Sequence, residues 1–124
     1  MTDKGLAGAE LAAEIAAYAD EKKAIDIVEL DVRGLVGYAD YFVICSGNTD
    51  RQVKAIHDGI YEEMKRAHDL VPRRVEGMPQ AQWVLMDYLD VIVHIFTPDT
   101  RAFYRLEQLW GEAPARAVGS GAAS

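Results

Sequence analysis

The chain has 124 residues, a length typical of one domain with a single hydrophobic core. Half of its residues are hydrophobic and 27% are charged, which excludes a chain that is disordered throughout. Thirteen lysines and arginines against 20 aspartates and glutamates give a net charge of -7. Because proteins that bind nucleic-acid phosphates carry a basic face, this charge argues against nucleic acid as the main contact and favours a basic protein partner.

Other features are typical of a cytoplasmic protein. The segment from Met1 to Ala9 lacks the basic and apolar regions of a secretory signal, and no apolar stretch approaches the roughly 18 residues that cross a membrane. The single cysteine, Cys45, lies inside an apolar run, so there is no internal disulfide and no paired-cysteine motif. We therefore expect a cytoplasmic protein that has no membrane partner.

Hydrophobic periodicity predicts a helix and then two strands in the first part of the chain. Residues 8–22 carry an apolar stripe at helical spacing. Residues 26–32 alternate between apolar and mostly acidic side chains, which is typical of a strand with one solvated side. Residues 41–45 are continuously apolar, which predicts a central strand covered on both faces.

Small residues at Ser46 and Gly47 lead into a second predicted helix that ends near Ala67. Thr49 and Gln52 have the spacing of a capping box, in which each side chain bonds to the backbone of the other residue. This pattern places the start of the helix directly after Thr49.

Two runs rich in β-forming residues, 83–86 and 91–96, flank a short break and predict an antiparallel hairpin. Residues 73–75 are interpreted as a short edge strand. Thr97 followed by Pro98 predicts the start of a third helix. The apolar side of that helix holds Phe103, Leu106 and Trp110.

The order of these elements predicts an α/β fold, a mixed β-sheet flanked by helices. Residues 1–111 are expected to form the domain. Residues 112–124 have small side chains without an apolar period, so we expect a flexible C-terminal tail there.

One pattern suggests an enzyme. Ser46 and Gly47, between a strand and a helix, resemble a phosphate-binding turn, and Asp87 and Asp90 are the nearest carboxylate pair for magnesium. Both pairs also suit local geometry, because small residues fit a strand-to-helix connection and aspartate fits a hairpin turn. The sequence therefore predicts no catalytic, cofactor or metal site, and a nucleotidyltransferase-like enzyme remains the alternative.

The remaining candidate groups favour structural roles. His57, His68 and His94 lie on separate predicted elements without the spacing of a zinc site. We interpret His94 as a hydrogen-bonded residue of the core or sheet face, and Cys45 as a packing residue. Basic pairs such as residues 73–74 are interpreted as solvated charges.

Two aromatic side chains on the predicted hairpin, Trp83 and Tyr88, lie beside Asp87 and Asp90. Aromatic residues anchor protein interfaces when exposed and fill cores when buried, and both options stay open for this pair. If both face outward, the hairpin offers apolar anchors ringed by negative charge, which suits an apolar patch surrounded by basic residues.

Blocks of sequence match a known family along most of the chain. In the first half, these blocks are Lys23, Asp26-Ile27, Leu30-Asp31-Val32, Ala39-Asp40-Tyr41-Phe42-Val43-Ile44, Ser46-Gly47, Arg51-Gln52-Val53 and Ala55-Ile56. In the second half, they are Glu76-Gly77, Trp83, Leu85, Asp87, Asp90-Val91, Val93-His94, Arg101, Phe103-Tyr104, Leu106-Glu107 and Leu109-Trp110. With these blocks the chain resembles the ribosomal silencing factors, also called Iojap-like proteins.

The resemblance implies a nucleotidyltransferase-like fold without enzymatic activity. It also implies binding to a large-subunit ribosomal protein, the one called L-fourteen, at the inter-subunit face. Bound there, such a factor sterically blocks joining of the small subunit and lowers translation when nutrients are scarce. A homodimer is expected when the protein is free.

The docking surface that the resemblance implies centres on Trp83, Leu85 and Asp87 and includes their neighbours. We expect the partner-binding residues to be Glu76, Trp83, Leu85, Asp87, Tyr88 and Asp90. In this hypothesis the tryptophan and leucine give apolar anchoring, while the acidic residues pair with basic groups of the partner. One departure is visible, because this chain has Tyr88-Leu89-Asp90 where the family usually has glycine before the second aspartate.

Overall fold

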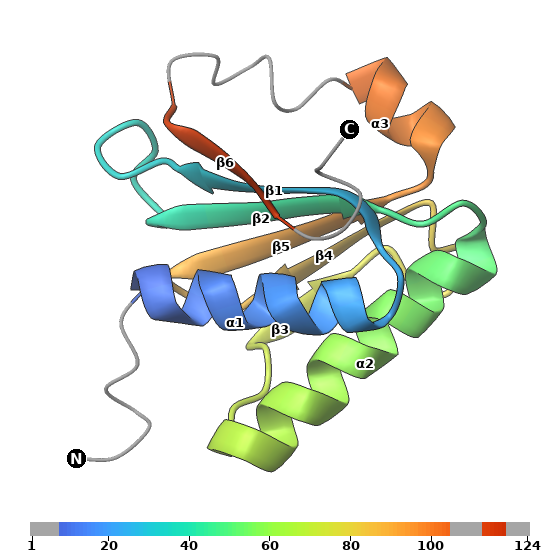
Figure 1. Cartoon of the computed structure of the whole chain (residues 1–124), viewed down its shortest axis with the longest axis horizontal. Helices are drawn as coiled ribbons and strands as arrows, with labels where there is room; N and C mark the ends of the chain where they lie inside the picture. The colour runs from blue at the N-terminus through green and yellow to red at the C-terminus, as the bar shows by residue number, and fades with distance from the viewer. Residues whose placement is uncertain (1–7, 105–112, 119–124) are drawn as a thin grey trace.

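The computed structural model describes residues 8–104 and 113–118, in which helices pack on a mixed sheet (Figure 1). The helices are α1 (Gly8–Glu21), α2 (Asp50–His68) and α3 (Pro98–Tyr104). The strands are β1 (Ile25–Asp31), β2 (Tyr41–Ser46), β3 (Arg74–Glu76), β4 (Trp83–Asp87), β5 (Val91–Phe96) and β6 (Ala115–Val118). Within these residues, no helix combines the length and the hydropathy that a membrane crossing requires.

The six described strands pair in the order β3-β4-β5-β2-β1-β6. β2 and β5 run parallel, and every other neighbouring pair is antiparallel. This arrangement confirms the predicted mixed sheet with helices, whereas the likeness to nucleotidyltransferases stays a prediction. β2 lies in the interior of the sheet, and its residues from Phe42 to Ser46 are buried, as the continuous apolar run predicted.

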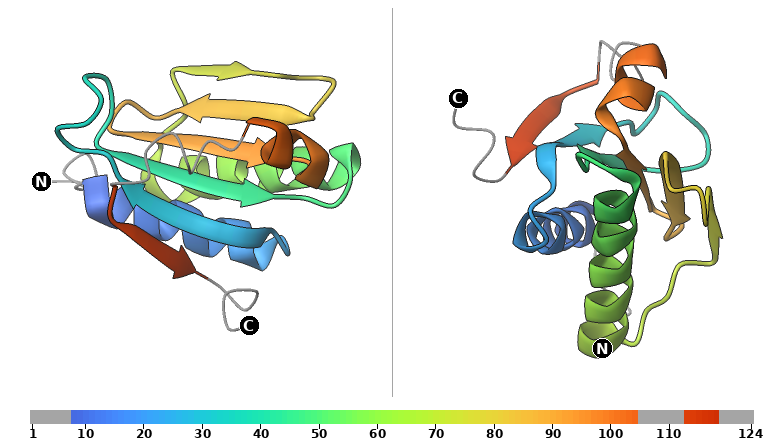
Figure 2. Two further views of the ribbon diagram at one scale, coloured as in Figure 1. Left: turned by 90° about the horizontal axis from the view of Figure 1, so that it is seen from above. Right: turned by 90° about the vertical axis from the view of Figure 1, so that its right-hand side faces the viewer.

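α1 and α2 cover one face of the sheet, here called the inner face (Figure 2). The apolar stripe of α2 is fully buried there and consists of Val53, Ile56, Ile60 and Met64. The buried side of α1 combines Leu11 and Ile15 with alanines, whose small side chains let the helix approach the sheet closely. Helical periodicity alone was therefore sufficient to predict which side of each helix is buried.

The opposite face of the sheet, here called the outer face, has a second apolar cluster. Phe42 and Ile44 of β2 and Ile92 and Phe96 of β5 are buried in it. α3 lies on this side of the sheet, away from α1 and α2 (Figure 2). Because strand side chains alternate between the two faces, each central strand contributes to both clusters.

The N-terminus of α2 confirms half of the predicted capping box. The Thr49 Oγ1 accepts a hydrogen bond from the backbone amide of Gln52 at 3.1 Å. The Gln52 side chain does not return to the cap in the expected way, because its Nε2 donates to the backbone oxygen of Lys22 instead. The glutamine thus ties the start of α2 to the end of α1.

The predicted start of the third helix is confirmed, since α3 begins at Pro98 directly after Thr97. The backbone oxygen of Thr97 accepts a hydrogen bond from the Arg101 amide at 3.0 Å. The predicted apolar contacts of Leu106 and Trp110 lie outside the described residues, and so does the side chain of Phe103.

The predicted flexible tail is wrong for Ala115–Val118. These residues form β6, which pairs antiparallel with β1 from Ile27 to Leu30. Main-chain hydrogen bonds to β1 order a segment whose small side chains carry no apolar period, and Arg116 adds an ion pair to Glu29 at 3.2 Å. The sheet therefore continues beyond the boundary predicted at residue 111.

Candidate functional site

Most of the predicted docking residues share the outer face at its β3–β4 end. In the antiparallel register, Glu76 of β3 lies opposite Leu85 of β4, and Leu85 lies opposite His94 of β5. Directly opposed residues project to the same face of a sheet, and Trp83 projects with Leu85 because the two are separated by two positions. The structure thus brings Glu76, Trp83 and Leu85 together on one surface.

The burial of the outer face decreases toward the β3 edge. Phe96 of β5 is fully buried, Trp83 and Leu85 of β4 are half-buried, and Glu76 of β3 is exposed. The Trp83 ring packs on the Phe96 ring with their centroids 5.0 Å apart. An apolar surface that is anchored on the core therefore remains partly open at β4, as a docking surface requires.

Asp87 has a different role from the one predicted for it. Its side chain is only 3% exposed, and its Oδ2 accepts a hydrogen bond from the Arg73 Nε at 3.2 Å. The same oxygen lies 3.8 Å from the Arg74 Nε, and the Oδ1 accepts from the backbone amide of Leu89 at 2.8 Å. The carboxylate therefore holds the turn and two arginines of its own chain, and it is not presented to a basic partner.

Tyr88 does not face outward with Trp83. Its side chain is 5% exposed and packs in the cluster beneath α1 and α2, on the inner face. Burial raises the pKa of Tyr88 above its ordinary range. Asp90 is exposed in the turn, and its backbone oxygen accepts hydrogen bonds from the amides of Asp40 and Tyr41. Of these two predicted contacts, the structure leaves only Asp90 accessible.

Leu89 occupies the turn in a left-handed conformation, with φ at 77°. This conformation favours glycine, the residue that the family usually has before Asp90. We expect Leu89→Gly to stabilise the protein by up to about 1 kcal/mol, because relief of about 1–2 kcal/mol of backbone strain exceeds the added freedom of the unfolded chain.

Urea unfolding of Leu89→Gly and Leu35→Gly would check this expectation. Both leucines are exposed, at 54% and 45%, but only Leu89 has a positive φ. Leu35→Gly should therefore destabilise the protein. Equal losses of stability in the two variants would contradict the expected relief of strain.

His94 confirms the prediction of a hydrogen-bonded residue of the sheet face. It is 6% exposed and lies among the rings of Phe42, Trp83 and Phe96, and its Nδ1 accepts a hydrogen bond from the Trp83 Nε1 at 3.2 Å. Burial lowers the pKa of His94 to about 4. Because an indole nitrogen can only donate, the neutral ring carries its proton on Nε2.

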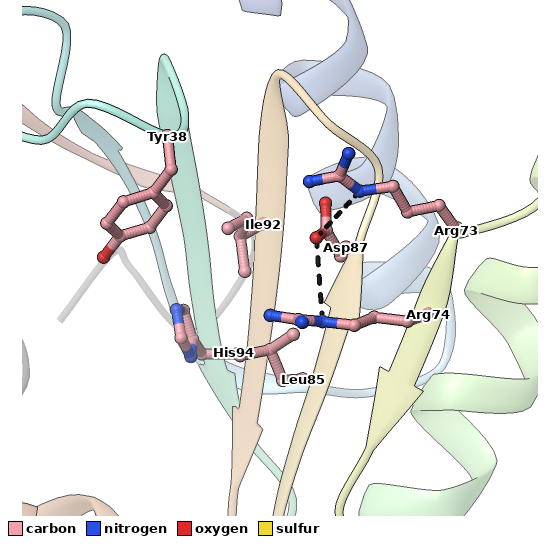
Figure 3. Close-up of a pocket in the computed structure, with 7 residues that line it drawn as sticks. All are labelled: Tyr38, Arg73, Arg74, Leu85, Asp87, Ile92 and His94. Atoms are coloured by element: carbon pink, nitrogen blue, oxygen red, sulfur yellow. Dashed lines mark hydrogen bonds and ion pairs between the residues drawn. The ribbon is translucent and has the colours of Figure 1, made fainter.

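A pocket of about 310 Å³ opens on the outer face between β3, β4, β5 and the segment before β2 (Figure 3). Arg74 at the start of β3 and Arg73 directly before it reach across the pocket, and the exposed ring of Tyr38 forms the opposite wall. Its other lining residues are Leu85, Asp87, Ile92 and His94. Both arginine side chains are 59% exposed, in keeping with their interpretation as solvated charges, but both also pair with Asp87. That pairing was not predicted, because the register that sets Arg74 opposite Asp87 is not visible in the local sequence.

The two parts of the alternative enzyme site are far apart. Ser46 ends β2, whereas the turn from Asp87 to Asp90 lies at the start of that strand, where Val91 is opposite Tyr41. A six-residue strand separates the two ends by roughly 17 Å. The geometry therefore does not bring the turn after Ser46 and the aspartates into one site.

Ser46 and Gly47 also have structural reasons for their small size. The Ser46 Oγ is buried and accepts a hydrogen bond from the Arg101 Nη1 at 2.9 Å. A Cβ on Gly47 would lie 2.8 Å from the backbone nitrogen of Val53. These contacts support the interpretation of this turn as a close connection between strand and helix.

His57 bonds to its neighbour Asp58, whereas His68 and Cys45 take part in packing. His68 on α2 pairs through its Nε2 with the Glu14 Oε2 on α1 at 2.7 Å. Cys45 is fully buried, and burial raises its pKa to about 12. Among residues 8–104 and 113–118, no group of three or more histidine, cysteine, aspartate or glutamate side chains is placed to hold a metal ion.

Comparison with known proteins gives consistent matches. Residues 7–123 match the family model described as ribosomal silencing factor during starvation. The chain is 46% identical over 99 residues to the ribosomal silencing factor RsfS of Bacillus subtilis, with 80% of this chain and 83% of that protein covered. It is 33% identical over 93 residues to the mouse protein named mitochondrial assembly of ribosomal large subunit protein 1, with 73% of this chain and 40% of that protein covered.

The fold also matches solved structures. An X-ray crystal structure of a protein from Chromobacterium violaceum has a TM-score of 0.74 at 31% identity, with 94% of this chain and 93% of that chain covered. The family match extends through β6 and confirms the resemblance that the sequence blocks indicated. The chain belongs to the ribosomal silencing factor family.

Proposed function

We propose that this protein represses translation by binding a protein of the large ribosomal subunit and blocking the small subunit from joining. Membership of the ribosomal silencing factor family supports a role at the ribosome. The name of the mouse relative refers to the large ribosomal subunit and supports that choice of particle. The main support for the proposed docking surface is that Trp83 and Leu85 on the outer face are both half-buried.

The surface around this pair has mixed charge. Glu76 and Asp90 are exposed and can pair with basic groups of the partner, in keeping with the net charge of -7. Arg74 pairs with Glu76 at 3.3 Å and Arg73 pairs with Asp87, so the partner surface should carry acceptors as well as basic residues. Asp87 supports this surface from within the chain by holding the two arginines.

The proposed mechanism is steric and needs no reaction. A stable protein interface buries roughly 1,600 Å² in total, which a domain of this size can provide on one side of its sheet. A folded domain bound at the inter-subunit face occupies volume that the small subunit must enter. Repression then depends only on the affinity of docking and on where the partner lies.

We expect Leu85→Lys to weaken binding to purified large subunits at least tenfold, about 1.4 kcal/mol, because it replaces an apolar anchor with a charge. A lysine at a half-buried position can extend its ammonium group to solvent, so the fold should persist. Leu35→Lys is the matched control, since Leu35 is an exposed leucine outside the docking surface. Co-sedimentation and circular dichroism would measure binding and folding, and unchanged binding of folded Leu85→Lys would contradict this assignment.

A second pair of variants tests the charge and the steric step. Glu76→Lys should weaken docking, whereas Glu62→Lys, an exposed position on α2, should not. Light scattering of mixed subunits then measures joining at saturating protein. Normal joining with the protein fully bound would contradict the steric mechanism and leave docking intact.

We further propose that the free protein is a homodimer, as the family resemblance implies. Analytical ultracentrifugation over a range of concentrations tests this directly. A monomer at all concentrations would contradict it.

A further inference from the structure

We propose that the pocket between β3, β4, β5 and Tyr38 binds a small organic anion, a carboxylate or phosphate carried on a short apolar body. This proposal concerns the free protein and does not depend on ribosome binding. It rests on three features of the pocket: two arginines that are held in place, a buried donor without an acceptor, and an apolar lining.

The two arginines are fixed by a carboxylate that cannot turn away from them. Asp87 is buried and bonds to the Arg73 Nε, with the Arg74 Nε 3.8 Å away. Within the described residues, the remaining ion pair of these arginines joins the Arg74 Nε to Glu76 at 3.3 Å. The N–H groups of the terminal nitrogens therefore remain available to donate to a ligand. Figure 3 shows both guanidinium groups extending over β4 toward Ile92 and His94.

The third donor is the Nε2 of His94. Its Nδ1 is occupied by the Trp83 indole, so the neutral ring carries its proton on Nε2. This nitrogen is buried and has no hydrogen-bond partner among residues 8–104 and 113–118, although the ring lines the same pocket. A buried donor without an acceptor is unfavourable, and an oxygen atom of a ligand would satisfy it.

Charge and donors together define the ligand. The lining carries two guanidinium groups and one carboxylate, since Glu76, the second partner of Arg74, is exposed and lies outside the lining. The unpaired nitrogen atoms of the lining are donors, so the ligand supplies acceptors and negative charge. Leu85, Ile92 and the Tyr38 ring give an apolar wall that a bare inorganic ion cannot use. The volume of about 310 Å³ lies at the small end of ligand sites and suits one ring or a short chain.

Benzoate is a suitable probe because it combines a carboxylate with a flat apolar body. Titration followed by calorimetry and by the ¹⁵N resonance of the His94 imidazole should give saturable binding with a shift of the Nε2 signal. Benzamide has the same shape without the charge and should bind at least about tenfold more weakly. Acetate lacks the apolar body and should also bind more weakly, while phenyl phosphate distinguishes a phosphate site from a carboxylate site.

Arg74→Gln should weaken benzoate binding by about tenfold or more, and this arginine is exposed enough for the variant to fold. Arg116→Gln removes an exposed arginine on β6 at the far edge of the sheet and should leave binding unchanged. Absence of any His94 shift up to the solubility limit of both benzoate and phenyl phosphate would overturn the proposal. Equal binding of benzoate and benzamide, or of benzoate to the wild type and folded Arg74→Gln, would overturn it as well.

Discussion

Gly77→Ala is expected to destabilise the protein by about 3 kcal/mol or more, the largest effect of any single methyl group considered for this chain. Gly77 has φ at +100°, a conformation that is strained for any residue with a Cβ. The added Cβ would overlap the backbone oxygen of Trp83 and would lie 2.9 Å from its carbonyl carbon. Backbone atoms of a central hairpin strand cannot yield as a flexible side chain can, so β3 must move away from β4.

Gly37→Ala is the matched control, because a Cβ on Gly37 meets nothing within 4 Å and its φ is not positive. Urea unfolding of both variants measures the two free energies, and Gly37→Ala should change stability by less than about 0.5 kcal/mol. If Gly77→Ala is as stable as Gly37→Ala, the expected close contact between Gly77 and the backbone of β4 is contradicted. A displaced β3 should also move Arg74 and Glu76, so the same variant should lose both docking and anion binding.

The second large effect is a loss of stability in acid that depends on His94. The pKa of His94 is about 4 in the folded protein, against an ordinary value of 6.5. Between these values the unfolded chain binds a proton that the folded protein excludes, so the contribution of His94 is complete above pH 6.5 and falls as the pH decreases to 4. The difference of about 2.5 pH units corresponds to about 3 kcal/mol.

Comparison with His94→Asn isolates this contribution. The asparagine oxygen can accept the hydrogen bond from Trp83 but has no proton to gain in this range. Glu14, whose pKa is lowered, titrates in both proteins, so its contribution to the pH dependence of stability cancels in the difference. The free energy of unfolding should therefore fall by about 3 kcal/mol more in the wild type than in the variant between pH 7 and pH 4. Parallel curves would contradict a buried neutral His94.

The local sequence was sufficient for most elements of the fold. Three elements could be recognised from local patterns that repeat every few residues and indicate burial. These patterns are the alternation in residues 26–32, the continuous apolar run of β2 and the helical stripe of α2. The hairpin of β4 and β5 was predicted for the same reason, since two β-forming runs are close in sequence. Glu76 is exposed, and Trp83 and Leu85 on β4 are half-buried. These positions are compatible with the docking surface that the family resemblance implies.

Features that depend on distant pairing could not be predicted in this way. β6 has almost no apolar pattern and is ordered by hydrogen bonds to β1, about 87 positions earlier in the chain. Tyr88 could fill a core or face solvent, and its inward position depends on the cover that α1 and α2 supply. The wide separation of Ser46 from Asp87 likewise follows from the parallel register of β2 and β5.

By itself, then, the sequence determined most of the elements, the apolar faces of α1 and α2 and the family of this protein, because periodicity and motif blocks are carried by residues close together in the chain. Only the tertiary structure decided that Asp87 holds Arg73 and Arg74 and that His94 keeps an unpaired donor beside them. The physical reason is that a polar side chain is available to a ligand only if the neighbouring residues leave some of its donors or acceptors without a hydrogen bond. Those neighbours are set by strand register and by burial, which no local pattern encodes.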